Sequence, residues 1–182
     1  MQLPNFPKWR ASASAFVLVA LVGLQGCVFT PKAEDGRELT PKQGLLVLKI
    51  SSNVDARLGF MDFKNESSFG IRFAEDLIGP TGFVFGKKDE EKYVVIPLDA
   101  GDYMWSKIEV YPKYAPLHAS NKFTVVANSI NYIGDVRIYS QDSSFSMRVV
   151  DREEAMRDYM SSKYPEYLKN MPVVKTLAEM RL

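Results

Sequence analysis

The 182-residue chain contains one cysteine and one histidine. Zinc sites recruit several Cys or His ligands, so these counts exclude the common classes of zinc site. The sequence also has no GxSxG nucleophile motif and no glycine-rich phosphate loop followed by Lys-Ser or Lys-Thr. The lone His118 lacks the context of a catalytic triad, and the acidic run near Asp89 lacks the spacing of a calcium loop. The sequence therefore predicts a protein that is not an enzyme and holds no metal.

An excess of either charge is also missing. The formal net charge is +1, and Lys8 and Arg10 lie at the start of the chain. Without residues 1–26 the chain has 21 basic and 22 acidic residues. A general phosphate-binding surface needs clustered Lys and Arg. Nucleic acid is therefore not an expected partner.

No apolar run reaches the length of a membrane-spanning helix. The run at residues 15–24 (AFVLVALVGL) has ten residues, whereas a spanning helix needs about 20. Lys8 and Arg10 precede this run, and small Gly26 follows it. These are the three parts of a secretory signal. The alternative is an uncleaved membrane anchor, which the short run disfavours.

The stretch LQGC at residues 24–27 resembles the lipobox of bacterial lipoproteins, in which an apolar, a variable and a small residue precede a cysteine. Leu24, Gly26 and Cys27 match, and Gln25 stands where a small residue is usual. The resemblance implies a signal peptide over residues 1–26, and diacylglyceryl and N-acyl chains such as palmitate on Cys27. It implies no other cofactor. The thiolate is the nucleophile for lipid transfer, and two or three acyl chains hold a protein firmly in a bilayer.

The residue after the cysteine bears on location. In enteric-type bacteria an Asp at this place resembles an inner-membrane retention signal, whereas this chain has Val28. The resemblance therefore implies attachment to the outer membrane, with the protein facing the periplasm. Membrane lipid, through Cys27, is the first expected partner.

The chain after the cysteine divides into three parts. Residues 28–43 contain two prolines, a glycine and mixed charges without apolar periodicity, which is typical of a flexible linker. We expect lipidated Cys27 and a flexible tether over 27–43, a β-sandwich domain over 44–150 and a helical segment over 151–182.

Apolar and polar residues alternate with period two in the central part, over residues 44–51, 68–73, 92–98, 102–111, 130–139 and 144–150. Such alternation predicts strands with one buried face. Short strands without interleaved helices predict a mainly β fold, a single antiparallel β-sandwich.

Two residues within these strands carry further information. Gly134 indicates a bulge or a close backbone approach, and Pro97 indicates an edge strand or a strand end. Taken at strict alternation, the pattern places Tyr132 with Val136 on one face and Asp135 on the other.

Helical spacing replaces the alternation after residue 150. Residues 151–154 (DREE) have the form of a capping box, and residues 155–160 carry an apolar stripe. Pro165 and Pro172 each begin a further short helical piece. Helices this short do not persist alone, so we expect them to pack on the sandwich.

Two short motifs carry a second resemblance. GDY at residues 101–103 begins one strand, and YIGD at residues 132–135 lies in a later one. The stretch that contains them is similar to small bacterial envelope lipoproteins with transthyretin-like or carboxypeptidase-regulatory-like sandwiches. The resemblance implies the fold and no activity.

Aromatic residues supply the candidate binding surface. Alternation over residues 102–111 places an aromatic face among charged side chains, which is suited to stacking on a sugar or a peptide. The following loop extends this surface. The alternative, which we favour for Trp105, is that the C-terminal helices cover it with Met156 and Met160. The candidate surface residues are Tyr103, Trp105, Tyr111, Tyr114 and His118.

Three functions remain open. The first is a lipid-anchored envelope lipoprotein that binds or scaffolds another envelope component, a protein or the cell wall, without catalysis. The second is a structural lipoprotein subunit of a secretion or cell-wall complex, which rests on fold analogy. The third, an envelope hydrolase, requires a pocket with converging polar groups.

Overall fold

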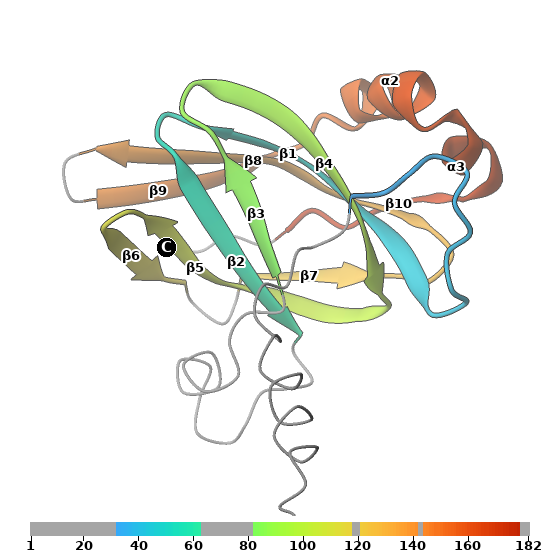
Figure 1. Ribbon diagram of the computed structural model, residues 1–182, viewed down its shortest axis with the longest axis horizontal. Helices are drawn as coiled ribbons and strands as arrows, with labels where there is room; N and C mark the ends of the chain where they lie inside the picture. Colours follow the sequence, from blue (N-terminus) through green and yellow to red (C-terminus); the bar gives the residue numbers. More distant parts are fainter. Residues whose placement is uncertain (1–31, 63–81, 118–120, 142–143, 179–182) are drawn as a thin grey trace, which may run out of the picture.

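The protein is represented by a computed structural model that describes residues 32–62, 82–117, 121–141 and 144–178 (Figure 1). The predicted signal peptide, Cys27, His118 and the predicted strand at 68–73 lie outside these residues. Within them, no helix has the length and apolar character needed to cross a membrane.

Ten strands and two helices follow one another in the described residues. They are β1 (Gln43–Ser52), β2 (Ala56–Asp62), β3 (Gly82–Gly86), β4 (Glu90–Asp99), β5 (Gly101–Val110), β6 (Lys113–Pro116), β7 (Lys122–Val125), β8 (Ile130–Gln141), β9 (Ser144–Val150), α2 (Glu153–Lys163), α3 (Pro165–Asn170) and β10 (Val173–Lys175).

The strands form two sheets (Figure 1). Sheet A has the order β10-β8-β1-β4, and β9 also pairs with β8; sheet B has the order β3-β2-β5-β6, and β7 also pairs with β5. The mainly β prediction is confirmed, and β4, which contains Pro97, is the edge strand of sheet A as predicted.

The prediction of a purely antiparallel arrangement is wrong for sheet A. Strands β1 and β10 both run parallel to β8, while β4 and β9 run antiparallel to their neighbours. Alternation of apolar residues reports which face of a strand is buried and contains no information about the direction of its neighbour. Parallel neighbours need a long connection, and here β2 to β7 lie between β1 and β8.

One hydrophobic cluster draws side chains from both sheets. Leu46, Leu48 and Ile50 of β1 contribute from sheet A, and Phe60 and Trp105 contribute from sheet B. The Phe60 and Trp105 rings meet edge to face, with centroids 6.0 Å apart. This cluster is the main core of the molecule.

A bulge in β5 changes which side chains face this core. Strand β2 advances one residue while β5 advances two, from Trp105 to Lys107, so Ser106 is the extra residue. An extra residue moves all following side chains to the opposite face. Trp105 and Ile108 therefore both enter the core. On the side away from β2, β5 pairs with β7 before this bulge and with β6 after it.

Strand β8 carries a similar bulge. From Tyr132 to Asp135, β8 advances three residues while β1 advances two, and Gly134 adopts a positive φ of 102°. The bulge expected at Gly134 is confirmed. It also makes the strict-alternation assignment wrong: Tyr132 belongs to the cluster outside sheet A, whereas Val136 faces the main core. Before this bulge β8 pairs with β10, and after it β8 pairs with β9.

The C-terminal segment covers the outer face of sheet A (Figure 1). Met156 and Met160 of α2 are buried in a second cluster with Val47 and Tyr132. The expectation that these helices pack on Trp105 is therefore wrong, because the β5 bulge turns Trp105 toward the main core. The third helical piece, expected after Pro172, is strand β10, which adds to the edge of β8.

The segment before β1 is docked on the domain, so the prediction of a flexible tether is wrong for residues 32–42. The Ala33 amide donates to the Val95 carbonyl at 2.9 Å, on the outer edge of β4. The Asp35 carboxylate accepts from the Tyr167 amide at 3.3 Å, and the Tyr167 hydroxyl donates to the Arg37 carbonyl at 2.7 Å. Composition alone did not show these contacts, because most of them use backbone groups.

Candidate functional site

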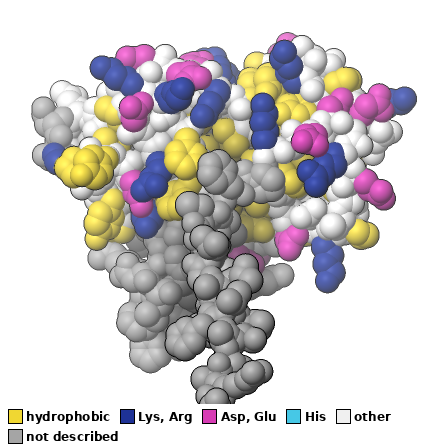
Figure 2. Space-filling view, in the orientation of Figure 1, with side chains coloured by type: hydrophobic (Ala, Val, Ile, Leu, Met, Phe, Trp, Pro, Cys, Tyr) yellow, Lys and Arg dark blue, Asp and Glu magenta, His cyan; other side chains and the backbone are white. Residues whose placement is uncertain are grey.

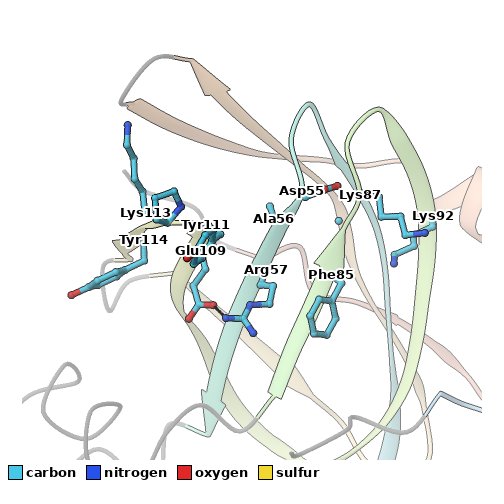
Figure 3. A pocket seen from close by; sticks show the side chains of 12 residues that line it. Asp55, Ala56, Arg57, Phe85, Lys87, Lys92, Glu109, Tyr111, Lys113 and Tyr114 are labelled. Atoms are coloured by element: carbon cyan, nitrogen blue, oxygen red, sulfur yellow. Dashed lines mark ion pairs between the residues drawn. The ribbon is translucent and has the colours of Figure 1, made fainter.

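A groove of about 790 Å³ opens at the ends of several strands of both sheets (Figure 3). Its lining comes from the start of β2, the end of β3, the start of β4 and the turn that joins β5 to β6. The lining residues are Asp55, Ala56, Arg57, Phe85, Gly86, Lys87, Lys92, Glu109, Tyr111, Pro112, Lys113 and Tyr114.

Three aromatic side chains of this lining are exposed to solvent. Tyr111 is 97% exposed, Tyr114 is 70% exposed and Phe85 is 51% exposed. In Figure 3 Tyr111 comes from the β5–β6 turn and Tyr114 from β6, while Phe85 lies across the groove on β3. Hydrophobic side chains are also visible at the left of the face shown in Figure 2, with charged side chains beside them. Apolar rings left exposed around one groove mark a contact surface.

Charged side chains also line the groove. Arg57 pairs with Glu109 (Figure 3). Lys107, which is not part of the lining, also reaches Glu109 at 3.1 Å. Lys87 and Lys92 lie on the side toward β4, and within the described ranges neither makes an ion pair with a carboxylate. The Glu109 charge is thus balanced, while the two lysines present positive charge to the groove.

The structure separates the predicted surface residues into two groups. Tyr111 and Tyr114 lie together at the groove. Trp105 is 0% exposed and Tyr103 is 3% exposed, so the prediction that these two form a binding surface is wrong; the Ser106 bulge places Trp105 in the core. His118, the lipobox residues Leu24, Gln25 and Gly26, and Cys27 lie outside the described residues.

Sequence reasoning missed the other side of the groove. Phe85 and Phe83 alternate in GFVFG, a period-two signal that identifies a strand with an aromatic face. No local pattern joins Phe85 to Tyr111, because Phe85 lies on β3 and Tyr111 lies in the turn after β5, and β2 stands between β3 and β5 in sheet B.

No protein-family model matches the chain. No curated protein matches it either. Among solved structures, the chain is similar to a leucine-rich repeat protein from Bacteroides thetaiotaomicron, with 13% identity and a TM-score of 0.32 over 68% of this chain. The chain spans 16% of that protein's length. A TM-score this low supports no conclusion about fold or function.

Among the described residues that line the groove there is no Ser, Cys or His. Across the described residues, no group of three His, Cys, Asp or Glu side chains is placed to hold a metal ion. The lining carboxylates are engaged, since Glu109 is paired as above and Asp55 accepts from the Lys88 amide at 2.9 Å.

A second cluster of polar groups, Tyr132 and Asp135 of the YIGD motif, is structural. The Tyr132 hydroxyl donates to Asp135 Oδ1 at 3.1 Å and accepts from the Arg152 amide at 2.9 Å. Residues three apart on a regular strand face opposite sides, so the Gly134 bulge is what brings these two together. The pair holds the start of α2 against sheet A.

Asp135 should make the stability of the protein depend on pH. Burial raises the pKa of this carboxyl, against the Tyr132 hydrogen bond and the charges of Lys49 and Arg152. The folded state therefore binds the proton more tightly than the unfolded state, and stability falls as pH rises from about 4 through the raised pKa. Asp135→Asn should remove this fall, as measured by urea unfolding at pH 3.5 to 7.

Asp151 provides a control of the opposite sign. Its hydrogen bond with Lys175 lowers its pKa, so its contribution to stability is present at neutral pH and lost as pH falls. Asp151→Asn should therefore lower stability at neutral pH, and its difference from wild type should shrink as pH falls. A wild-type profile that matches Asp135→Asn throughout would contradict the prediction for Asp135.

Proposed function

We propose that the chain is a lipid-anchored envelope lipoprotein that binds another envelope component without catalysing a reaction. The observation that carries the proposal is the groove, which exposes three aromatic rings beside Lys87 and Lys92, two lysines that pair with no carboxylate of the described residues. Rings and cations around one concave surface are suited to a ligand with both apolar and anionic parts.

The anchor in this proposal is lipid on Cys27, and the proposed location is the outer membrane on its periplasmic side. Support comes from the LQGC stretch at 24–27 and from Val28. Lipid attachment holds the domain at the membrane, which raises the effective concentration of the groove near other envelope components.

The finer fold in this proposal is a β-sandwich of the transthyretin-like kind. The shared core cluster supports it, because that cluster takes side chains from both sheets. The two resemblance motifs have structural roles that fit this reading. Tyr103 of GDY donates a hydrogen bond to the Asp99 carbonyl at 2.8 Å, which closes the β4–β5 connection, and YIGD seats α2.

Cys27→Ser should remove the protein from the outer membrane. Serine cannot form the thioether that holds the diacylglyceryl group, and each acyl chain contributes roughly 0.8 kcal/mol per buried CH₂. We expect wild-type protein in the detergent-soluble membrane fraction, and Cys27→Ser either in the soluble fraction or retained with its leader intact at the inner membrane. Immunoblots of separated membranes distinguish these locations.

Gln25→Ala is the matched control, because it places a small residue where one is usual and should leave anchoring unchanged. Mass spectrometry of the mature wild-type amino terminus completes the test. An unmodified thiol at Cys27, or outer-membrane retention of Cys27→Ser, would contradict the proposal.

A further inference from the structure

Docking of residues 32–42 leaves little chain between the domain and the proposed lipid site. Ala33 is buried and bonded to Val95 on the outer edge of β4. Six residue steps separate Cys27 from Ala33, and a fully extended chain covers at most about 3.6 Å per residue. A lipidated Cys27 would therefore lie within roughly 22 Å of this edge. The bilayer must lie close to β4.

Either end of β4 can approach the bilayer under this limit. Lys92, in the groove lining, lies three residues from Val95 in one direction. Leu98, which pairs with Gly44, lies three residues away in the other. At about 3.4 Å per residue, each end is roughly 10 Å from the point where the segment docks. The chemistry of the two ends decides which one faces lipid.

The groove end has the side chains that favour a bilayer surface. Tyrosine and lysine are typical of the interface, where the ring lies among the headgroups and the ammonium pairs with phosphate. Tyr111, Tyr114 and Phe85 supply exposed rings, and Lys87 and Lys92 supply cations. Asp89, before β4, and Glu90, its first residue, line a separate hollow with Asn53 and Tyr139.

Within the described residues, the opposite end of β4 lacks this combination of exposed rings and lysines. Val126 is the exposed large hydrophobic residue there, at 43%, beside the start of β1. The charged side chains at this end are of both signs, with exposed Asp99 and Asp102 near Lys42 and Lys122. Mixed charge, with no exposed ring among the described side chains there, gives no preference for an anionic surface.

From these observations we propose that the groove docks on the phosphate headgroups of the bilayer that holds the Cys27 lipid. This inference rests on the proposed function and names the envelope component as anionic lipid. The lipid anchor and the groove then act as two membrane contacts on one face. The domain is held in a fixed orientation, with α2 and α3 left available on the outer face of sheet A.

A fluorescent thiol label tests this orientation in the full lipidated protein. Cys27 is the single cysteine, and lipid occupies its sulfur, so an introduced cysteine is the one reactive thiol. Lys113→Cys places the label between Tyr111 and Tyr114 and leaves Lys87 and Lys92 in place. Val126→Cys is the matched control at the opposite end of the domain.

The label is read in vesicles that contain about 30% anionic phospholipid and a lipid-attached quencher. We expect at least twofold stronger quenching at position 113 than at position 126, and a loss of this difference at 1 M salt, where the Debye length falls to about 3 Å. Lys87→Gln and Lys92→Gln should each weaken docking about fivefold at low salt.

Each other outcome contradicts the proposed function, the membrane-docking inference or both. Two labels per chain would show a free Cys27 thiol and would overturn both the proposed function and this inference. A lipidated chain with equal quenching at the two positions would overturn the inference alone. Protection of the 113 label by a soluble anionic glycan, without stronger quenching in vesicles, would assign the groove to glycan and likewise overturn membrane docking.

Discussion

Asn131→Asp should destabilise the protein by about 4 kcal/mol or more, because it places an oxygen where the fold needs a donor. Asn131 is fully buried on β8. Its Nδ2 donates to the carbonyls of Leu45, Val126 and Ser129 at 3.2, 3.0 and 3.1 Å, and its Oδ1 accepts from the Val126 amide at 2.8 Å. Aspartate keeps the single acceptor and turns three attractive contacts into oxygen–oxygen repulsion.

The expected shift in Tm is a decrease of roughly 8–16 °C, since 1 kcal/mol corresponds to about 2–4 °C in a protein of this size. Thermal unfolding followed by circular dichroism measures it. Asn128→Asp is the control, because Asn128 is exposed in the turn before β8 and the same chemical change should cost less than about 0.5 kcal/mol there. Equal shifts for the two variants would mean that the Asn131 hydrogen bonds do not stabilise the fold.

Gly134→Ala should destabilise the protein by about 2–4 kcal/mol through two separate effects. The φ of Gly134 is +102°, a conformation that is unfavourable for any residue with a Cβ. An added Cβ would also lie 2.3 Å from Val149 Cγ1 on the neighbouring strand β9. Valine is stiff at χ1, so the contact is relieved only by movement of β9 or of the bulge.

Two further variants separate these effects. Gly36→Ala changes a glycine at φ +73°, where an added Cβ would meet its nearest neighbour at 3.7 Å, so it reports the cost of backbone conformation without a clash. Adding Val149→Ala to Gly134→Ala removes the clash and should recover part of the lost free energy of unfolding. Denaturant unfolding of the wild type, the two single glycine variants and the double variant measures the cost of the backbone conformation and the cost of the clash. Gly134→Ala with wild-type stability would show that β8 adopts a regular strand there.

The groove shows how far sequence reasoning reached toward the candidate site. Tyr111 and Tyr114 were predictable as surface residues because they lie in a short loop rich in polar residues and proline. The sequence did not predict that Phe85 and Lys92 line the same groove. Phe85 lies on β3 of sheet B, and Lys92 lies on β4 of sheet A. Their meeting depends on how sheet A and sheet B are placed at this end of the molecule, and no spacing within the chain encodes that placement.

The docked amino-terminal segment is a similar case. Its prolines, glycine and mixed charges are typical of a linker, and the sequence contains no apolar stripe to indicate docking. The segment is held by the backbone hydrogen bond from Ala33 to Val95 of β4 and by Asp35 at the start of α3. These partners exist only once those elements are in place. Composition therefore gave the wrong expectation of a flexible tether at residues 32–42.

By itself, the sequence determined the mainly β class, the approximate positions of β1, β4, β5, β8 and β9, the helical period after residue 150 and the bulge at Gly134. Each of these follows from side-chain periodicity or from the backbone freedom of one residue, and both are local properties. The tertiary structure decided strand direction, the faces of β5 and β8 beyond their bulges, the sheet face that α2 covers and the composition of the groove. A single extra residue in a strand inverts every side chain that follows it, and whether that residue is accommodated depends on the neighbouring strand, which only the folded chain supplies.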